Sequence, residues 1–156
     1  MFLVISVEYK LTSFDERETI EFAENLESEK FPNMVICLKG NLGSGKTVFT
    51  KGFANALGIT DTITSPTFNI VKEYFGAELP LFHMDVYRLD ETDVQIDFRE
   101  YFVRKGICII EWADMISSEL PEERLEISFK IINEDTRMLI IKPFGKKYED
   151  LCEAVL

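Results

Sequence analysis

The sequence GNLGSGKT, residues Gly40 to Thr47, is the most informative part of the chain because it fits the pattern GxxxxGK[ST] at every required position. Glycines let a backbone fold around an anion with its amides pointing inward, and the start of a following helix adds a positive dipole. In this pattern the side chain of Lys46 reaches the β and γ phosphates of a nucleotide, and the hydroxyl of Thr47 binds Mg²⁺. The sequence therefore predicts a phosphate-binding loop for ATP with Mg²⁺.

The segments on either side of this loop have the character that the motif requires. Residues 34–38, MVICL, form a short continuous apolar run, which is typical of a central parallel strand buried on both faces. After the loop, Phe49, Phe53 and Leu57 recur on one helical face until Gly58 ends the pattern. The order of strand, glycine loop and helix supports the assignment of the loop.

The rest of the chain alternates helical and strand patterns. Ser13 and Glu16 match a capping box, and residues 13–30 have the spacing of an amphipathic helix. A second helix is expected over 90–105 and a short terminal helix over 145–155, with strands at 68–75, 79–85, 107–112, 124–131 and 136–142. We therefore expect one α/β domain over residues 1–156, with the three layers of a P-loop NTPase-like fold and a mixed, mostly parallel sheet flanked by helices.

Composition and charge limit the function. The formal net charge is -11, which makes direct, unaided binding of nucleic acid improbable and requires an ATP site to supply its own positive charge locally. The apolar start lacks the features of a signal peptide, and no run is long enough to span a bilayer, so we expect a cytoplasmic protein with no membrane partner. Three widely spaced cysteines and one histidine support neither a disulfide framework nor a zinc site.

Two acids follow apolar strand patterns and are candidates for the chemistry. Glu111 ends the run ICII of residues 107–110, which resembles a Walker B strand with Glu in place of Asp, and it is a candidate ligand of Mg²⁺. Asp85 ends the strand pattern of residues 81–84, where open α/β sheets place their ligands, and it is a candidate to orient or deprotonate the attacking water. The alternative for either residue alone is a solvated acid at a strand end.

Four further residues have a structural and a functional interpretation. His83 shares a strand face with Asp85, so that a hydrogen-bonded structural role and a catalytic role are both open. Arg88 is a charge stabiliser or a surface ion-pair partner. Thr67, in the loop TSPT, either senses the γ-phosphate or belongs to an ordinary turn. Trp112 is either a core residue or, because it lies beside Glu111, a residue of the site.

Four motifs together resemble the bacterial TsaE family, also called YjeE. They are GNLGSGKT, SPTF at 65–68, HMDVYRL at 83–89 and EW at 111–112, and the match runs from about Thr12 to Arg137. The resemblance implies an accessory P-loop ATPase for the threonylcarbamoyladenosine modification of tRNA next to the anticodon, acting with TsaB and TsaD. It implies slow hydrolysis by the protein alone, with TsaD as the transferase and with tRNA contacted only through the assembled complex.

The resemblance also assigns roles to individual residues. Thr47 and Glu111 are the expected Mg²⁺ ligands, and the expected catalytic residues are Lys46, Thr67, Asp85 and Glu111. The expected nucleotide-binding residues are Thr12, Asn41, Leu42, Gly43, Ser44, Gly45, Lys46, Thr47, Val48, Trp112 and Arg137. The chain departs from the family pattern in having Asn41 for Asp, Ser44 for Ala, and Asp97-Phe98 where the family has a glycine.

Two other functions use the same loop. A small-molecule kinase needs a substrate pocket and an arginine-bearing lid, and the chain has few arginines and no clear lid insertion. A non-catalytic nucleotide switch needs ATP binding alone, and the presence of both Asp85 and Glu111 argues against it. A guanine-specific switch is disfavoured because the sequence has no NKxD motif.

Overall fold

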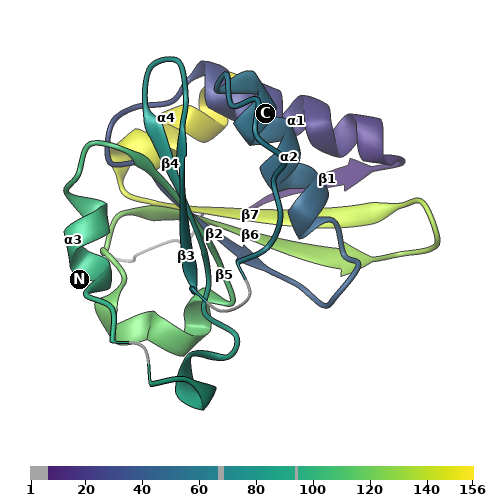
Figure 1. Ribbon diagram of the computed structural model, residues 1–156. Coiled ribbons are helices and arrows are strands. Elements are labelled where there is room, and N and C mark those ends of the chain that lie inside the picture. Colours follow the sequence, from purple (N-terminus) through teal and green to yellow (C-terminus); the bar gives the residue numbers. More distant parts are fainter. Residues whose placement is uncertain (1–6, 67–68, 94) are drawn as a thin grey trace, which may run out of the picture.

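The protein is built on a seven-stranded sheet with the strand order β1-β7-β6-β2-β5-β4-β3 (Figure 1). The computed structural model describes residues 7–66, 69–93 and 95–156. The strands are β1 (Tyr9–Ser13), β2 (Val35–Lys39), β3 (Val71–Phe75), β4 (Pro80–Asp85), β5 (Ile107–Glu111), β6 (Arg124–Ile131) and β7 (Arg137–Phe144).

The sheet is mixed, but it is not mostly parallel, and that part of the sequence-based expectation is wrong. The four central strands β6, β2, β5 and β4 are parallel, whereas β1 with β7, β7 with β6, and β4 with β3 pair antiparallel. Short connections explain two of the antiparallel pairs, because a parallel neighbour needs a crossover of a dozen or more residues. Only residues 76–79 join β3 to β4, and only residues 132–136 join β6 to β7.

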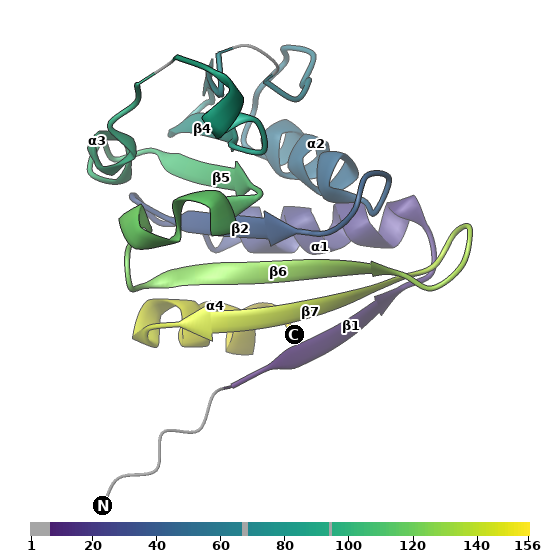
Figure 2. The same cartoon turned by 90° about the horizontal axis from the view of Figure 1, so that it is seen from below.

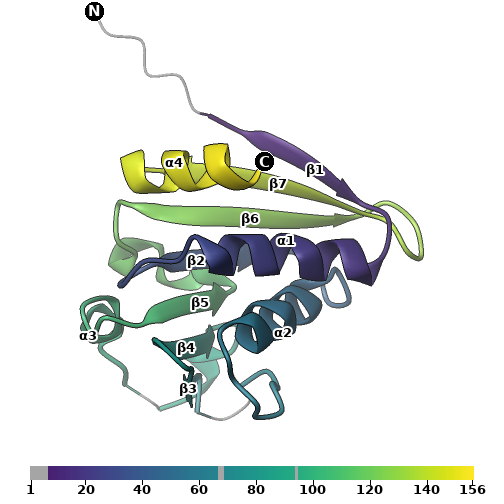
Figure 3. The same cartoon turned by 90° about the horizontal axis from the view of Figure 1, so that it is seen from above.

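Helices cover both faces of the sheet, so the expected three layers are present. The helices α1 (Glu16–Ser28), α2 (Lys46–Ala56) and α4 (Lys146–Val155) lie over one face (Figure 3). The short helix α3 (Phe98–Phe102) and the 3₁₀ segment η2 (Ala113–Glu119) lie on the opposite face (Figure 2). A further 3₁₀ turn, η1 (Leu89–Glu91), follows β4.

Two hydrophobic cores join these layers. The larger core packs α1, α2 and α4 against the sheet and contains a group of aromatic rings from Phe22, Phe49, Phe53 and Phe129. The smaller core packs α3 and η2 against β4, β5 and β2. Because residues of β2 and β5 enter both cores, these strands are buried on both faces, as the apolar runs predict.

Two local predictions need correction. The capping box of α1 uses Asp15 and Glu18 in place of Ser13 and Glu16: Asp15 Oδ1 accepts from the Glu18 N–H at 2.9 Å, and Glu18 Oε1 accepts from the Phe14 N–H at 2.8 Å. The helix expected over 90–105 is, among the described residues of that range, α-helical only at Phe98–Phe102. Asp97 caps the start of α3, and a left-handed residue, Lys105 at φ 61°, follows its end, so that only one apolar turn remains.

Candidate functional site

The glycine loop joins the end of β2 to the start of α2, and its backbone needs glycine. Gly40, Gly43 and Gly45 have φ values of 151°, 78° and 112°. At Gly40 a Cβ atom would lie 2.6 Å from Ser44 Oγ and 2.9 Å from the Phe129 carbonyl oxygen. The buried Ser44 hydroxyl has no hydrogen-bond partner among the described residues, and no side chain caps the start of α2. The loop therefore has the form that an anion needs, with unpaired donors at a helix N-terminus.

Lys46 is the first residue of α2 and lies at the centre of the site. Its Nζ donates to the Gly40 carbonyl oxygen at 2.7 Å and lies 4.2 Å from the ring centroid of Trp112. Burial lowers the pKa of Lys46, and the nearby carboxylates of Glu111 and Asp85 oppose this effect. The ammonium group is thus held between the loop and the two acids that the sequence singles out.

Asp85 and Glu111 are brought together by the parallel pairing of β4 with β5, in which they are register partners. Burial raises the pKa of Asp85, while a hydrogen bond from the Tyr87 N–H to its Oδ1 at 3.1 Å opposes the shift. Glu111 is almost fully buried, and its Oε2 is 2.9 Å from Nε2 of His83. Both acids border the same pocket as Lys46.

Trp112 follows Glu111 with a left-handed backbone, at φ 62° and ψ 38°. This turn brings its ring 4.7 Å from the ring of Tyr87, measured between centroids, and over the Lys46 ammonium. Trp112 packs on the smaller core and also borders the pocket, and its role in binding a nucleotide stays a prediction.

A pocket of about 360 Å³ lies over the loop and the ends of β4 and β5. Its lining contains most of the residues predicted from the sequence, which come from four separate parts of the chain. They are Leu42, Gly43, Ser44, Gly45, Lys46, Thr47, Val48, Asp85, Glu111, Trp112 and Arg137.

Other predicted residues do not border this pocket. Thr12 lies on β1 and lines a smaller hollow of about 160 Å³ against α1 and the end of α4. Asn41 is exposed in the loop, and Arg88 is exposed beyond β4. Contact of these three residues with a nucleotide stays a prediction. Thr67 lies outside the described residues, although Ser65 of the same loop borders the pocket.

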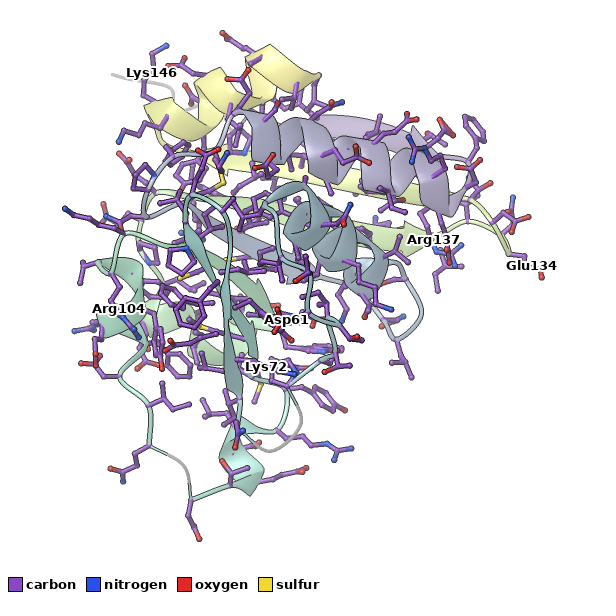
Figure 4. All side chains as sticks on the ribbon, turned by 45° about the horizontal axis from the view of Figure 1, so that its top comes forward. Asp61, Lys72, Arg104, Glu134, Arg137 and Lys146 are labelled. Atoms are coloured by element: carbon purple, nitrogen blue, oxygen red, sulfur yellow. The ribbon has the colours of Figure 1, made fainter. Side chains whose placement is uncertain are left out.

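The pocket also has lining residues that sequence reasoning missed. Asp15, Glu16 and Thr19 come from the start of α1, and Glu134 and Asp135 come from the turn between β6 and β7. Figure 4 shows Glu134 and Arg137 together at this end of the hairpin. No motif for nucleotide binding marks these positions. The antiparallel pairing of β1 with β7, which is a long-range contact, brings the two segments together.

Arg137 ties the hairpin turn to the glycine loop. Its Nη1 donates to the carbonyl oxygens of Asn133, Glu134 and Thr136, and its Nη2 donates to the Gly43 carbonyl oxygen at 3.1 Å. The loop is therefore supported from two sides, by Lys46 at Gly40 and by Arg137 at Gly43.

The side chains at the pocket fit a nucleotide with Mg²⁺. The loop and Lys46 offer donors and positive charge to phosphate, and the oxygens of Thr47, Asp85 and Glu111 are of the kind that Mg²⁺ prefers. Within the described ranges no group of three or more His, Cys, Asp or Glu side chains is arranged to hold a metal ion. A magnesium ion here would thus take further ligands from phosphate oxygens and water, which is its usual behaviour in nucleotide sites.

The fold and the pocket define a mixed α/β protein with a Walker A type loop at the carboxyl edge of its central strands. The family model "Threonylcarbamoyl adenosine biosynthesis protein TsaE" matches residues 13–139. The chain therefore belongs to the TsaE family, which confirms the resemblance carried by the sequence motifs.

Individual relatives agree with this assignment. The chain is 44% identical over 144 residues to the tRNA threonylcarbamoyladenosine biosynthesis protein TsaE of Bacillus subtilis (strain 168), a match that covers 92% of this chain and 91% of that protein. It is 42% identical over 109 residues to the TsaE protein of Treponema pallidum (strain Nichols), covering 69% and 80% of the two chains. The crystal structure of Bacillus subtilis YdiB superposes with a TM-score of 0.83 at 39% identity and covers 98% of this chain and 97% of that one. None of the helices in the described part of the chain has the length and apolar character to cross a bilayer.

Proposed function

We propose that this chain is a P-loop ATPase that hydrolyses ATP with Mg²⁺ as an accessory step in the threonylcarbamoyladenosine modification of tRNA. It acts in the cytoplasm as a single domain in complex with TsaB and TsaD, and it meets tRNA only through that complex. Hydrolysis by the protein alone is slow, because the partners complete or gate the site.

One observation carries the ATPase proposal. The strand-end acids Asp85 and Glu111 are register partners, and they face the same pocket as Lys46 and Thr47 of the glycine loop. A loop that only binds phosphate does not need two acids at this position. A site that splits ATP needs oxygen ligands for the metal and a group that positions water.

The residues divide these tasks. The loop amides and Lys46 hold the β and γ phosphates, while Thr47 and Glu111 hold Mg²⁺. Bound Mg²⁺ supplies positive charge to the phosphate oxygens. We assign Asp85 to the attacking water because burial raises its pKa, which makes it a better proton acceptor than an ordinary aspartate. The water oxygen bonds to the γ phosphorus and gives a proton to Asp85. The bond from that phosphorus to the bridging oxygen breaks, its electron pair stays on the oxygen of ADP, and phosphate is released.

The proposal is tested by measuring phosphate release from ATP by the purified protein, alone and with TsaB, TsaD and tRNA. Lys46→Ala serves as the blank, and Lys51→Ala is the matched control because Lys51 is an exposed lysine of the same helix. We expect slow turnover alone, faster turnover with TsaB and TsaD, loss with Lys46→Ala, and no change with Lys51→Ala.

Three other results would contradict parts of the proposal. A rate of ATP hydrolysis that does not change when TsaB and TsaD are added would remove the support for the role in tRNA modification. Phosphate transfer to a member of a panel of small acceptors, in place of release to water, would favour a kinase. ATP binding that no combination of partners converts into turnover would favour a nucleotide switch.

A further inference from the structure

The only histidine of the chain, His83, makes a buried contact with Glu111. The distance from His83 Nε2 to Glu111 Oε2 is 2.9 Å, and both side chains are almost completely shielded from solvent. The two residues lie on adjacent parallel strands, where His83 is the register partner of Ile109 and sits two residues before Asp85. His83 thus lies two residues further from the carboxyl end of β4 than Asp85, which borders the pocket.

The chemistry of the pair fixes the direction of the hydrogen bond. A carboxylate only accepts, so the bond to Glu111 uses a hydrogen on Nε2, and in a neutral imidazole this leaves Nδ1 as an acceptor. Nδ1 is buried and has no hydrogen-bond partner among the described residues. An unpaired buried acceptor destabilises a fold, and an aliphatic side chain would fill this position without that cost. The presence of histidine is therefore better explained by its contact with Glu111 than by packing.

We propose that His83 is the positioning residue of Glu111, and that it sets the affinity of the site for the divalent cation. The His83 bond occupies Oε2 and holds the carboxylate in one orientation, so that Oε1 is left for the pocket. Hydrogen bonds from groups behind a metal ligand orient that ligand, and their loss typically weakens metal binding about 10- to 100-fold. This inference rests on the proposed function only in taking Glu111 as a metal ligand.

Equilibrium binding of Mn²⁺ to the ADP complex tests the role without turnover. Free Mn²⁺ is measured by electron paramagnetic resonance, and Trp112, the only tryptophan, reports ADP binding by its fluorescence. We expect His83→Leu to weaken Mn²⁺ binding at least about tenfold, with metal-free ADP affinity unchanged. His83→Gln, whose amide can still donate to Glu111, retains most of the Mn²⁺ affinity.

Two further variants separate positioning from general loss of structure. Tyr148→Phe removes another buried hydrogen bond, from the Val35 N–H to the Tyr148 hydroxyl at 2.9 Å, outside the pocket lining. We expect it to leave Mn²⁺ affinity unchanged. His83→Asn, whose amide nitrogen takes the place of Nδ1 and not of Nε2, should weaken Mn²⁺ binding in the parent and have no further effect in a Glu111→Ala background, because His83 acts through Glu111. This cycle needs no His83→Leu protein and decides the question if that variant fails to fold.

Either of two results overturns the positioning role. One is a folded His83→Leu variant with the Mn²⁺ affinity of the parent, and the other is an equal loss of Mn²⁺ affinity on His83→Asn with and without Glu111. A parent protein that binds Mn²⁺ with ADP but never hydrolyses ATP would overturn the proposed ATPase and leave the role of His83 standing. A parent protein that binds no Mn²⁺ would overturn both.

Discussion

Replacing Phe49 with alanine removes the aromatic ring that anchors α2 beneath the glycine loop. Phe49 is completely buried and lies three residues after Lys46. Its ring centroid is 6.0 Å from that of Phe22 in α1, 6.3 Å from that of Phe53, and 6.1 Å from that of Phe129 in β6. One side chain therefore joins α1, α2 and the sheet at the end of α2 that follows the glycine loop.

The expected cost of Phe49→Ala is large. Truncation of a buried phenylalanine to alanine usually lowers the free energy of unfolding by about 3 to 5 kcal/mol, because a cavity is left behind. The edge-on contact with Phe129, at an interplanar angle of 72°, adds about 0.5 to 1.5 kcal/mol beyond burial and places the value in the upper part of that range. Total stabilities are on the order of 5 to 15 kcal/mol, so the variant should lose a large fraction of its stability.

Urea denaturation followed by Trp112 fluorescence measures this loss. Phe75→Ala is the matched control, because Phe75 lies on the edge strand β3 and is 80% exposed. We expect the control to change the free energy of unfolding by less than about 0.5 kcal/mol. A loss below about 1 kcal/mol for Phe49→Ala would refute the reasoning that this ring anchors α2.

Three more substitutions test the site. Glu111→Ala should slow Mg²⁺-dependent ATP hydrolysis at least about tenfold, or about 1.4 kcal/mol, and unchanged phosphate release would rule out its role as a metal ligand. Burial raises the folded pKa of Asp85 above 3.8, so its ionisation destabilises the fold increasingly as pH rises from 3.8 through the folded pKa. Asp85→Asn should therefore unfold at higher urea than the parent at pH 7 and lose this advantage below pH 3.8; an equal advantage at both pH values would contradict the burial argument. Gly40→Ala places a Cβ atom 2.6 Å from Ser44 Oγ and 2.9 Å from the Phe129 carbonyl oxygen, and it should abolish ATP binding in a calorimetric titration; parent-like affinity would show that the loop tolerates a side chain.

The local patterns in the sequence were sufficient to predict the strand and the helix on either side of the glycine loop. The apolar run at 34–38 corresponds to β2 at Val35–Lys39, and the helix expected to end at Gly58 corresponds to α2 at Lys46–Ala56. The strand-end positions of Asp85 and Glu111 were also predictable, since both follow short runs of buried residues. Their proximity follows once β4 and β5 are taken as parallel neighbours, because the carboxyl ends of parallel strands meet at one edge.

Long-range pairing was not predictable from these signals. The choice of β7 as partner for β1 brings Ser13 opposite Arg137 and sets the start of α1 beside the hairpin turn. This arrangement supplies the second half of the pocket, and Thr12 is not part of it. The chain leaves β1 after Ser13 and enters α1 at Glu16, so Asp15 and Glu16 border the pocket and Thr12 does not.

The charge of the pocket explains why the loop geometry matters so much in this chain. Among the described residues, six carboxylates border the pocket (Asp15, Glu16, Asp85, Glu111, Glu134 and Asp135), against two cations, Lys46 and Arg137. Arg137 already donates to four carbonyl oxygens, so Lys46, the loop amides and the dipole of α2 supply most of the attraction for phosphate. In the proposed function, a nucleotide that arrives with Mg²⁺ would bring positive charge of its own to Asp85 and Glu111. The net negative charge of the protein disfavours binding of nucleic acid. At this pocket the same negative charge favours binding of the nucleotide together with Mg²⁺ over binding of the nucleotide alone.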